Sequence, residues 1–76
     1  MLHEHDRVIL LSPLAGQDLE AGDVGTVVHV YADGQALELE FVGLDGHTTA
    51  VATVEMPQVR GVTERDMTHT REIQTA

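Results

Sequence analysis

Five short apolar segments separated by turn residues make up most of the chain, and this pattern predicts strands. The segments are residues 7–11, 26–31, 37–41, 48–54 and a last one around residues 60–62. They are rich in valine, isoleucine and threonine, whose branched side chains suit a pleated sheet. Regularly spaced short strands are typical of small antiparallel barrels and sandwiches. We therefore expect an all-β domain with no helix longer than one turn, which we place at residues 56–59.

The third segment has the clearest pattern in the chain. Strict alternation places Leu37, Leu39 and Phe41 on one face of the strand. Glu38 and Glu40 lie on the opposite face. A slip of one residue would bury both glutamates, so we expect a well-defined register.

Turn and loop residues connect the segments. Asp-Gly pairs at residues 33–34 and 45–46 favour tight hairpin turns, because this dipeptide tolerates positive φ angles. Ser12-Pro13 ends the first strand, since proline cannot donate to a ladder. We expect residues 14–21 to form a loop that Leu14 and Leu19 anchor to the core.

The second segment begins with a glycine motif. Residues 22–30, Gly-Asp-Val-Gly-Thr-Val-Val-His-Val, match the G-x-x-G-x-V pattern of KOW and other SH3-like barrels. In this interpretation the glycines allow a sharp turn and the valines start a bent strand. We predict that residues 1–62 form a small five-stranded SH3-like barrel, closed or nearly closed.

The same motif, with the Asp-Gly turns, Leu39–Val42 and Val59-Arg60, resembles a narrower family over roughly residues 5–62. It is a bacterial family of small proteins described as a domain of unknown function, the one numbered 4926. The resemblance implies an SH3-like barrel and brings no catalytic residues. Genes of this kind often neighbour toxin-like or effector-like genes, which implies an immunity or antitoxin role.

Residues 63–76 have a different, polar character. Thr63 and Asp66 have the spacing of a helix cap. Met67 and Ile73 are the only large apolar residues, however, and they do not share a helix face. We expect a short, frayed C-terminal tail, and leave open that it becomes ordered on a partner.

Charge narrows the range of partners. The chain has thirteen acidic residues, four arginines and no lysine, a net charge of −9, and residues 1–62 alone carry −8. Nucleic-acid binding is disfavoured, because affinity for phosphates comes from lysine and arginine. A basic protein would be attracted by this field. The alternative is that the acidity serves solubility alone, or reflects an acidic host proteome.

Our leading hypothesis is a non-catalytic binding module for a basic protein. We assign the binding face to Tyr31, Glu38 and Glu40, with Asp33 and Asp45 in the neighbouring turns. The alternative is a structural or scaffolding barrel that self-associates. Apolar residues of the Val24–Val30 strand that are not buried in the core would support self-association.

A metal-dependent enzyme is a second, less favoured alternative. His3 and His5 would point the same way in an extended segment and could bind a transition metal, but tight sites need three or four ligands. We favour a solvated N-terminus. Nucleophilic catalysis lacks candidates, since the chain has no cysteine and Ser12 is its only serine. We predict no cofactor and no enzymatic activity.

Location is inferred from what the sequence lacks. The absence of cysteine fits a reducing compartment. The first residues lack the basic and apolar regions of a secretory signal, and no apolar run approaches the ~18 residues of a membrane span. We expect a cytoplasmic protein that does not bind membranes.

Overall fold

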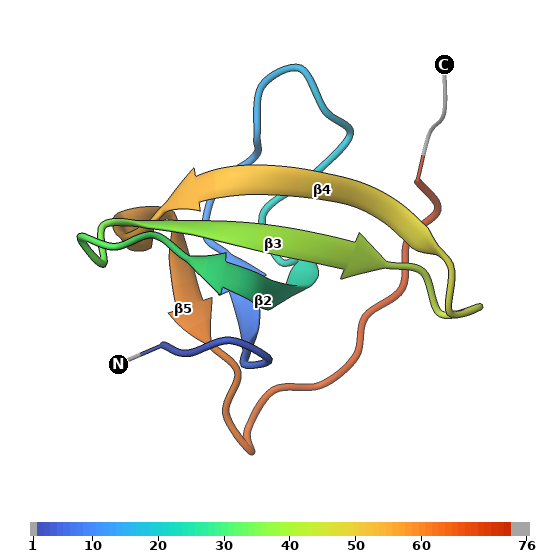
Figure 1. Cartoon of the computed structure of the whole chain (residues 1–76). Helices are drawn as coiled ribbons and strands as arrows, with labels where there is room; N and C mark the ends of the chain where they lie inside the picture. The colour runs from blue at the N-terminus through green and yellow to red at the C-terminus, as the bar shows by residue number, and fades with distance from the viewer. Residues whose placement is uncertain (1, 74–76) are drawn as a thin grey trace.

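The computed structural model describes residues 2–73 and contains five antiparallel strands in a single bent sheet (Figure 1). The last three residues of the predicted tail lie outside the described residues. The sheet order is β4-β3-β2-β1-β5. This arrangement confirms the predicted all-β class, and SH3-like is a fair description of it. The strands are β1 (Arg7–Leu10), β2 (Val24–Val30), β3 (Ala36–Val42), β4 (Thr48–Glu55) and β5 (Val59–Gly61).

The sheet bends over itself without forming a hydrogen-bonded cylinder. Within the described residues, no ladder joins β4 to β5, the two strands at the ends of the sheet order. They are connected by the single 3-10 turn η1 (Met56–Gln58), which confirms the one turn expected there. Figure 1 shows β3 and β4 arching over β1 and β5. Packing of side chains between these layers therefore holds the two ends of the sheet together.

The core lies inside this bend and contains residues from every strand. Leu37 and Leu39 have no exposed surface and Phe41 is 4% exposed, which confirms the alternation predicted for β3. Leu19 is also buried and pairs with Leu14 in an isolated bridge, so the 14–21 loop is anchored as expected. The other buried members of the core cluster are Val8, Leu10, Val27, Ala52, Val54 and Val59.

The two glycines of the motif, Gly22 and Gly25, have different roles, whereas the sequence predicted a turn for both. Gly22 makes the turn, with a positive φ of 96°, but Gly25 lies inside β2. Its missing side chain makes room for Phe41: a Cβ atom here would lie 3.0 Å from Cε1 of that ring. Gly25 is thus required by close packing and not by a turn. Strand β2 accordingly begins at Val24, two residues earlier than predicted.

A register shift in β2 determines what its second half presents to solvent. Val27 pairs with Leu39 and His29 with Glu38, so Val28 is an extra residue between them. An insertion of this kind bends a strand and redirects side chains. Val28 and His29 are both exposed, whereas Val27 is buried. The bulge therefore adds two side chains to the outer surface of the sheet beside Glu38.

Side chains satisfy several backbone groups at the outer strands. The side-chain amide of Gln17 donates to the carbonyl of Val51 in β4 at 3.3 Å. At the end of β4, the backbone amide of Glu55 donates to Oε1 of Gln58 at 2.7 Å. In β5, the Arg60 side chain donates to the carbonyl of Gly61 at 3.1 Å. Backbone groups that would otherwise be unpaired at a sheet edge thus have partners from the same chain.

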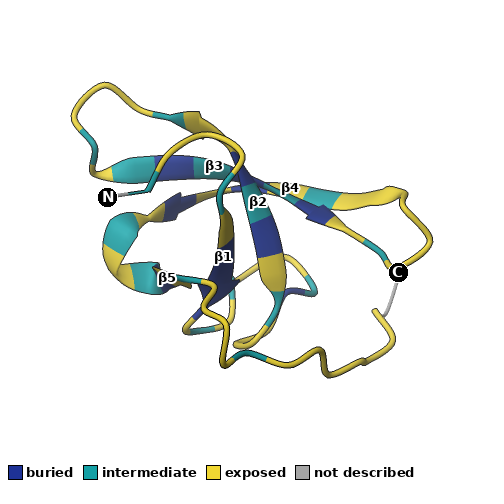
Figure 2. Cartoon of the chain, turned by 90° about the horizontal axis from the view of Figure 1, so that it is seen from below, coloured by how far each residue is buried: buried dark blue, intermediate teal, exposed yellow. Residues whose placement is uncertain are grey.

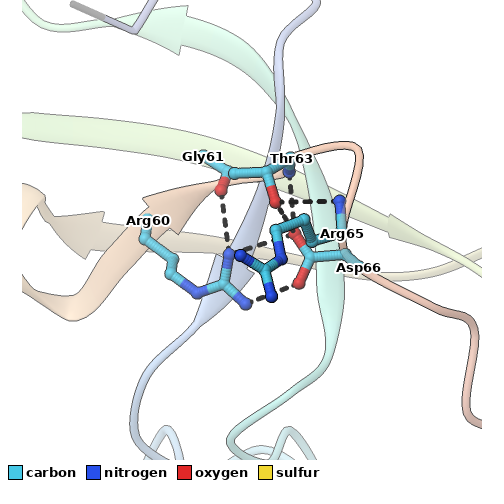
Figure 3. A network of polar contacts seen from close by, with 5 residues as sticks. All are labelled: Arg60, Gly61, Thr63, Arg65 and Asp66. Atoms are coloured by element: carbon cyan, nitrogen blue, oxygen red, sulfur yellow. Dashed lines mark hydrogen bonds and ion pairs between the residues drawn. The ribbon is translucent and has the colours of Figure 1, made fainter.

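The tail leaves β5 without helix or strand in residues 62–73, as the sequence predicts, and Figure 2 shows most of it exposed. Asp66 shapes its first turn: its carboxylate accepts hydrogen bonds from Arg60 at 2.7 and 3.1 Å and from the Thr63 amide at 2.7 Å (Figure 3). The bonds from Arg60 and Thr63 hold the pKa of Asp66 well below its usual value. Thr63 and Asp66 therefore make a turn and not a helix cap.

Candidate functional site

The outer surface of β2 and β3 carries three of the predicted binding residues. Glu38 lies opposite His29 in the register, and Glu40 lies opposite Thr26. The rings of His29 and Tyr31 pack edge to face, with centroids 4.7 Å apart. Tyr31 is 38% exposed. Glu38, Glu40 and Tyr31 thus lie on one continuous surface, which we call the outer face and define by these three residues and His29.

The two glutamates are half-buried and carry charges that no arginine neutralises within residues 2–73. Glu40 accepts a hydrogen bond from the Thr48 hydroxyl at 2.7 Å, an interaction that leaves the carboxylate charge uncompensated. Within residues 2–73, neither Glu38 nor Glu40 forms an ion pair with an arginine. Two arginines are instead engaged by aspartates elsewhere. The outer face can therefore offer two carboxylates to a cationic group.

Asp33 and Asp45 lie in the two hairpins at opposite ends of β3. A seven-residue strand separates them, which is about 20 Å of extended chain. Each carboxylate also has a partner within its own turn, since Asp33 accepts from the Gln35 amide at 2.9 Å and Asp45 accepts from the His47 amide at 3.0 Å. Hydrogen bonds from His47 lower the pKa of Asp45. These aspartates stabilise the turns beside the outer face, which is where the sequence placed them, one turn at each end of β3.

The N-terminal histidines are arranged differently from the prediction. His5 has a positive φ of 76° and lies in a turn, so the segment is not extended. The prediction that the rings of His3 and His5 point the same way depended on an extended segment and therefore no longer holds. The His3 amide donates to the Asp6 carboxylate at 2.8 Å. No group of three potential metal ligands occurs among residues 2–73.

A second acidic site, which the sequence analysis missed, lies in the loop before β2. The carboxylate of Asp23 accepts two hydrogen bonds from Arg71, from Nε at 2.9 Å and from Nη2 at 2.5 Å. The same Nη2 donates to the carbonyl of Asp18 at 2.8 Å, and Glu20 lies 3.5 Å from Nη1. We call residues 18–23 the acidic loop. It holds one guanidinium group by a fork of parallel bonds.

The pKa of Asp23 reflects this arrangement. Burial raises it, but hydrogen bonds from Arg71 and from the Glu20 amide outweigh burial and leave the pKa below its usual value. The hydrogen bonds with Asp23 raise the pKa of Arg71. The sequence contains a partial signal for this site, which is three acidic residues within six positions and an arginine in a polar tail. No sequence pattern, however, indicates that Asp23 and Arg71, which are 48 positions apart, are in contact.

The charge distribution predicts a salt effect on stability. We expect the Tm to rise when sodium chloride is raised from about 0.01 M to about 0.15 M, because the Debye length falls from ~30 to ~8 Å and screens the net charge of −9. Thermal unfolding followed by circular dichroism measures this effect. The variant Glu38→Gln/Glu40→Gln should respond less. A Tm that falls with salt would mean that the ion pairs of Arg60 and Arg71 outweigh the repulsion.

The comparisons with known proteins identify a family. The model of the domain of unknown function DUF4926 matches residues 4–61, which is most of the chain, so the chain belongs to this family. The match confirms the resemblance found in the sequence. Neither the curated proteins nor the solved structures include a match to this chain. No helix among the described residues is long and apolar enough to cross a membrane.

Proposed function

We propose that this chain is a non-catalytic module that binds a basic protein partner through its outer face. The observation that supports this proposal is the charge of the half-buried Glu38 and Glu40, which no arginine neutralises within residues 2–73. Tyr31 adjoins them and is 38% exposed. A tyrosine beside carboxylates offers apolar contact area together with charge, a combination found at protein interfaces.

The chemistry of the outer face favours lysine or arginine side chains as ligands. Carboxylates accept charge-assisted hydrogen bonds, and a guanidinium or ammonium group is the natural donor in a protein. The same charge opposes binding of nucleic acids, whose phosphates would be repelled. A basic, toxin-like protein is a partner of this kind, which would give the chain an immunity or antitoxin role. We place this function in the bacterial cytoplasm. The chain has no cysteine, so its fold contains no disulfide that a reducing environment would break.

Charge reversal on the outer face tests the proposal. Tagged wild-type chain and the variant Glu38→Lys/Glu40→Lys are used to capture proteins from a lysate of the source cells at low and moderate salt. We expect the wild type to retain a basic protein that the variant loses. With the purified pair, the variant should lower the association rate by about ten-fold at low salt, because steering by charge acts on the encounter.

The control separates the outer face from net charge. Glu64 and Glu72 are exposed in the tail, and Glu64→Lys/Glu72→Lys changes the net charge by the same amount. We expect it to retain the partner with an association rate close to that of the wild type. If both variants lower the association rate equally, the effect is one of net charge and not of the outer face. If the Glu38→Lys/Glu40→Lys variant associates at the wild-type rate, the outer face is not the binding site.

A self-associating barrel is the second candidate, and one observation favours it. Val24 is 48% exposed and Val28 is 42% exposed, so not all the apolar residues of β2 are buried in the core. Exposed apolar area on a sheet is a common site of association. Sedimentation velocity over a range of concentrations distinguishes the two candidates. A chain that stays monomeric at every concentration contradicts self-association.

A further inference from the structure

The acidic loop and the tail that carries Arg71 differ in how many contacts hold them to the strands. The acidic loop is fixed to β1 at its end, where the Leu10 amide donates to the Asp23 carbonyl at 2.9 Å and the Gly22 amide donates to the Leu10 carbonyl at 2.8 Å. The Glu20 amide donates to the Asp23 carboxylate at 2.8 Å, and Leu19 is buried in the core. The acceptor groups are therefore positioned by the barrel and do not depend on the tail.

The tail that carries Arg71 is held at its first turn by the contact between Arg60 and Asp66, and beyond that turn it has no regular structure. Residues 62–73 form no helix or strand, and Met67 is 91% exposed. Nine residues lie between Gly61, the end of β5, and Arg71. A short tether without helix or strand gives the arginine an effective concentration of roughly the millimolar range at the loop. Partly exposed ion pairs shift an equilibrium by less than about ten-fold. Arg71 is thus bound as a tethered ligand that can be displaced.

Open space lies beside the guanidinium of Arg71. An open hollow of about 220 Å³ is lined by the acidic loop and the tail. Its lining residues are Glu20, Ala21, Gly22, Asp23, His69 and Arg71. Without the tail, this hollow would lose the wall formed by His69 and Arg71, and Asp23 would remain in its lining.

We infer that the acidic loop is an arginine-binding site, that Arg71 is its internal ligand, and that an arginine of a basic protein takes the same position when the tail is displaced. This inference rests on the proposed function, to which it adds a second contact and an element of competition. The forked bonds of Asp23 match the planar guanidinium, whereas an ammonium group offers no such fork. The site should therefore prefer arginine over lysine.

Titration with an arginine analogue tests the inference on the full chain. The probe is N-acetyl-arginine-N-methylamide, and its binding is followed by the NMR shifts of the amides of residues 18–23. Removal of the internal ligand in Arg71→Ala should strengthen binding of the probe by about five-fold relative to the wild type, since the competing contact is of that size. The corresponding lysine analogue should bind Arg71→Ala more weakly than the arginine analogue.

Two further variants make the test specific. Arg65→Ala removes a tail arginine whose side chain forms no hydrogen bond or ion pair with residues 2–73; its backbone amide donates to the Thr63 hydroxyl, and the variant should behave like the wild type. Arg71→Ala/Asp23→Asn should lose the response of the loop amides. Equal binding in the wild type and Arg71→Ala, or no response of the loop in Arg71→Ala, would overturn the inference. Because the probe reports on the loop and not on the outer face, this result is independent of the Glu38→Lys/Glu40→Lys experiment.

Discussion

Replacement of Leu39 by alanine is expected to remove most of the stability of the folded chain. Leu39 has no exposed surface and lies in the core, on strand β3, which is paired with β2 on one side and β4 on the other. Removing a buried leucine side chain costs about 2–5 kcal/mol, because apolar burial is lost and a cavity remains. A domain of this size has a net stability of only about 3–5 kcal/mol. The loss therefore matches most of the free energy of unfolding.

Urea unfolding followed by far-ultraviolet circular dichroism measures this effect. Val51→Ala is the control, since Val51 lies on the neighbouring strand β4 and is 50% exposed. We expect it to change the free energy of unfolding by less than about 1 kcal/mol, the range of strand propensities. A Leu39→Ala chain that unfolds at the same urea concentration as the wild type would mean that the core does not depend on this side chain.

The second large effect is expected at Gly25. An alanine there would place its Cβ 3.0 and 3.1 Å from two carbons of the Phe41 ring and 3.4 Å from Cβ of Leu39. The ring is 4% exposed and cannot turn outward. Overpacking of this kind costs about 1–3 kcal/mol. Glycine in a strand is itself unfavourable by about 0.5–1 kcal/mol relative to alanine, so part of the loss is offset.

A double-mutant cycle tests this cause directly. Gly25→Ala should be less destabilising in a Phe41→Leu background, because the ring that it meets is gone. Gly61→Ala is the control: its Cβ would lie 3.7 Å from Leu2, an ordinary contact, and we expect little change in stability. If Gly25→Ala costs the same with and without the ring, the contact with Phe41 is not the reason for this glycine.

Much of the fold could be predicted because its determinants are local. Alternation in residues 37–41 specified which side chains of β3 are buried, and the Asp-Gly pairs marked two of the hairpins. The function of Gly25 could not be read in this way, since it depends on a ring sixteen positions away in the chain. The bulge at Val28 was also missed, because a register shift depends on how two strands pair.

The candidate site was predictable to a smaller extent. Glu38, Glu40 and Tyr31 were found because strand periodicity shows which side chains share a face. Asp33 and Asp45 were assigned to the neighbouring turns from their Asp-Gly pairs, and they lie in the hairpins at the two ends of β3. The acidic loop was not found, because the partner of Asp23 lies in a tail whose polar composition gives no signal of where it returns.

The side chains that satisfy the outer strands have a consequence for how copies of this chain meet at high concentration. Fibrils grow when a strand of one molecule extends the open sheet of another through backbone hydrogen bonds. On β4, an incoming strand would first have to displace Gln17 from Val51 and Gln58 from Glu55. Fibril nucleation would therefore begin by breaking bonds that the folded molecule already has.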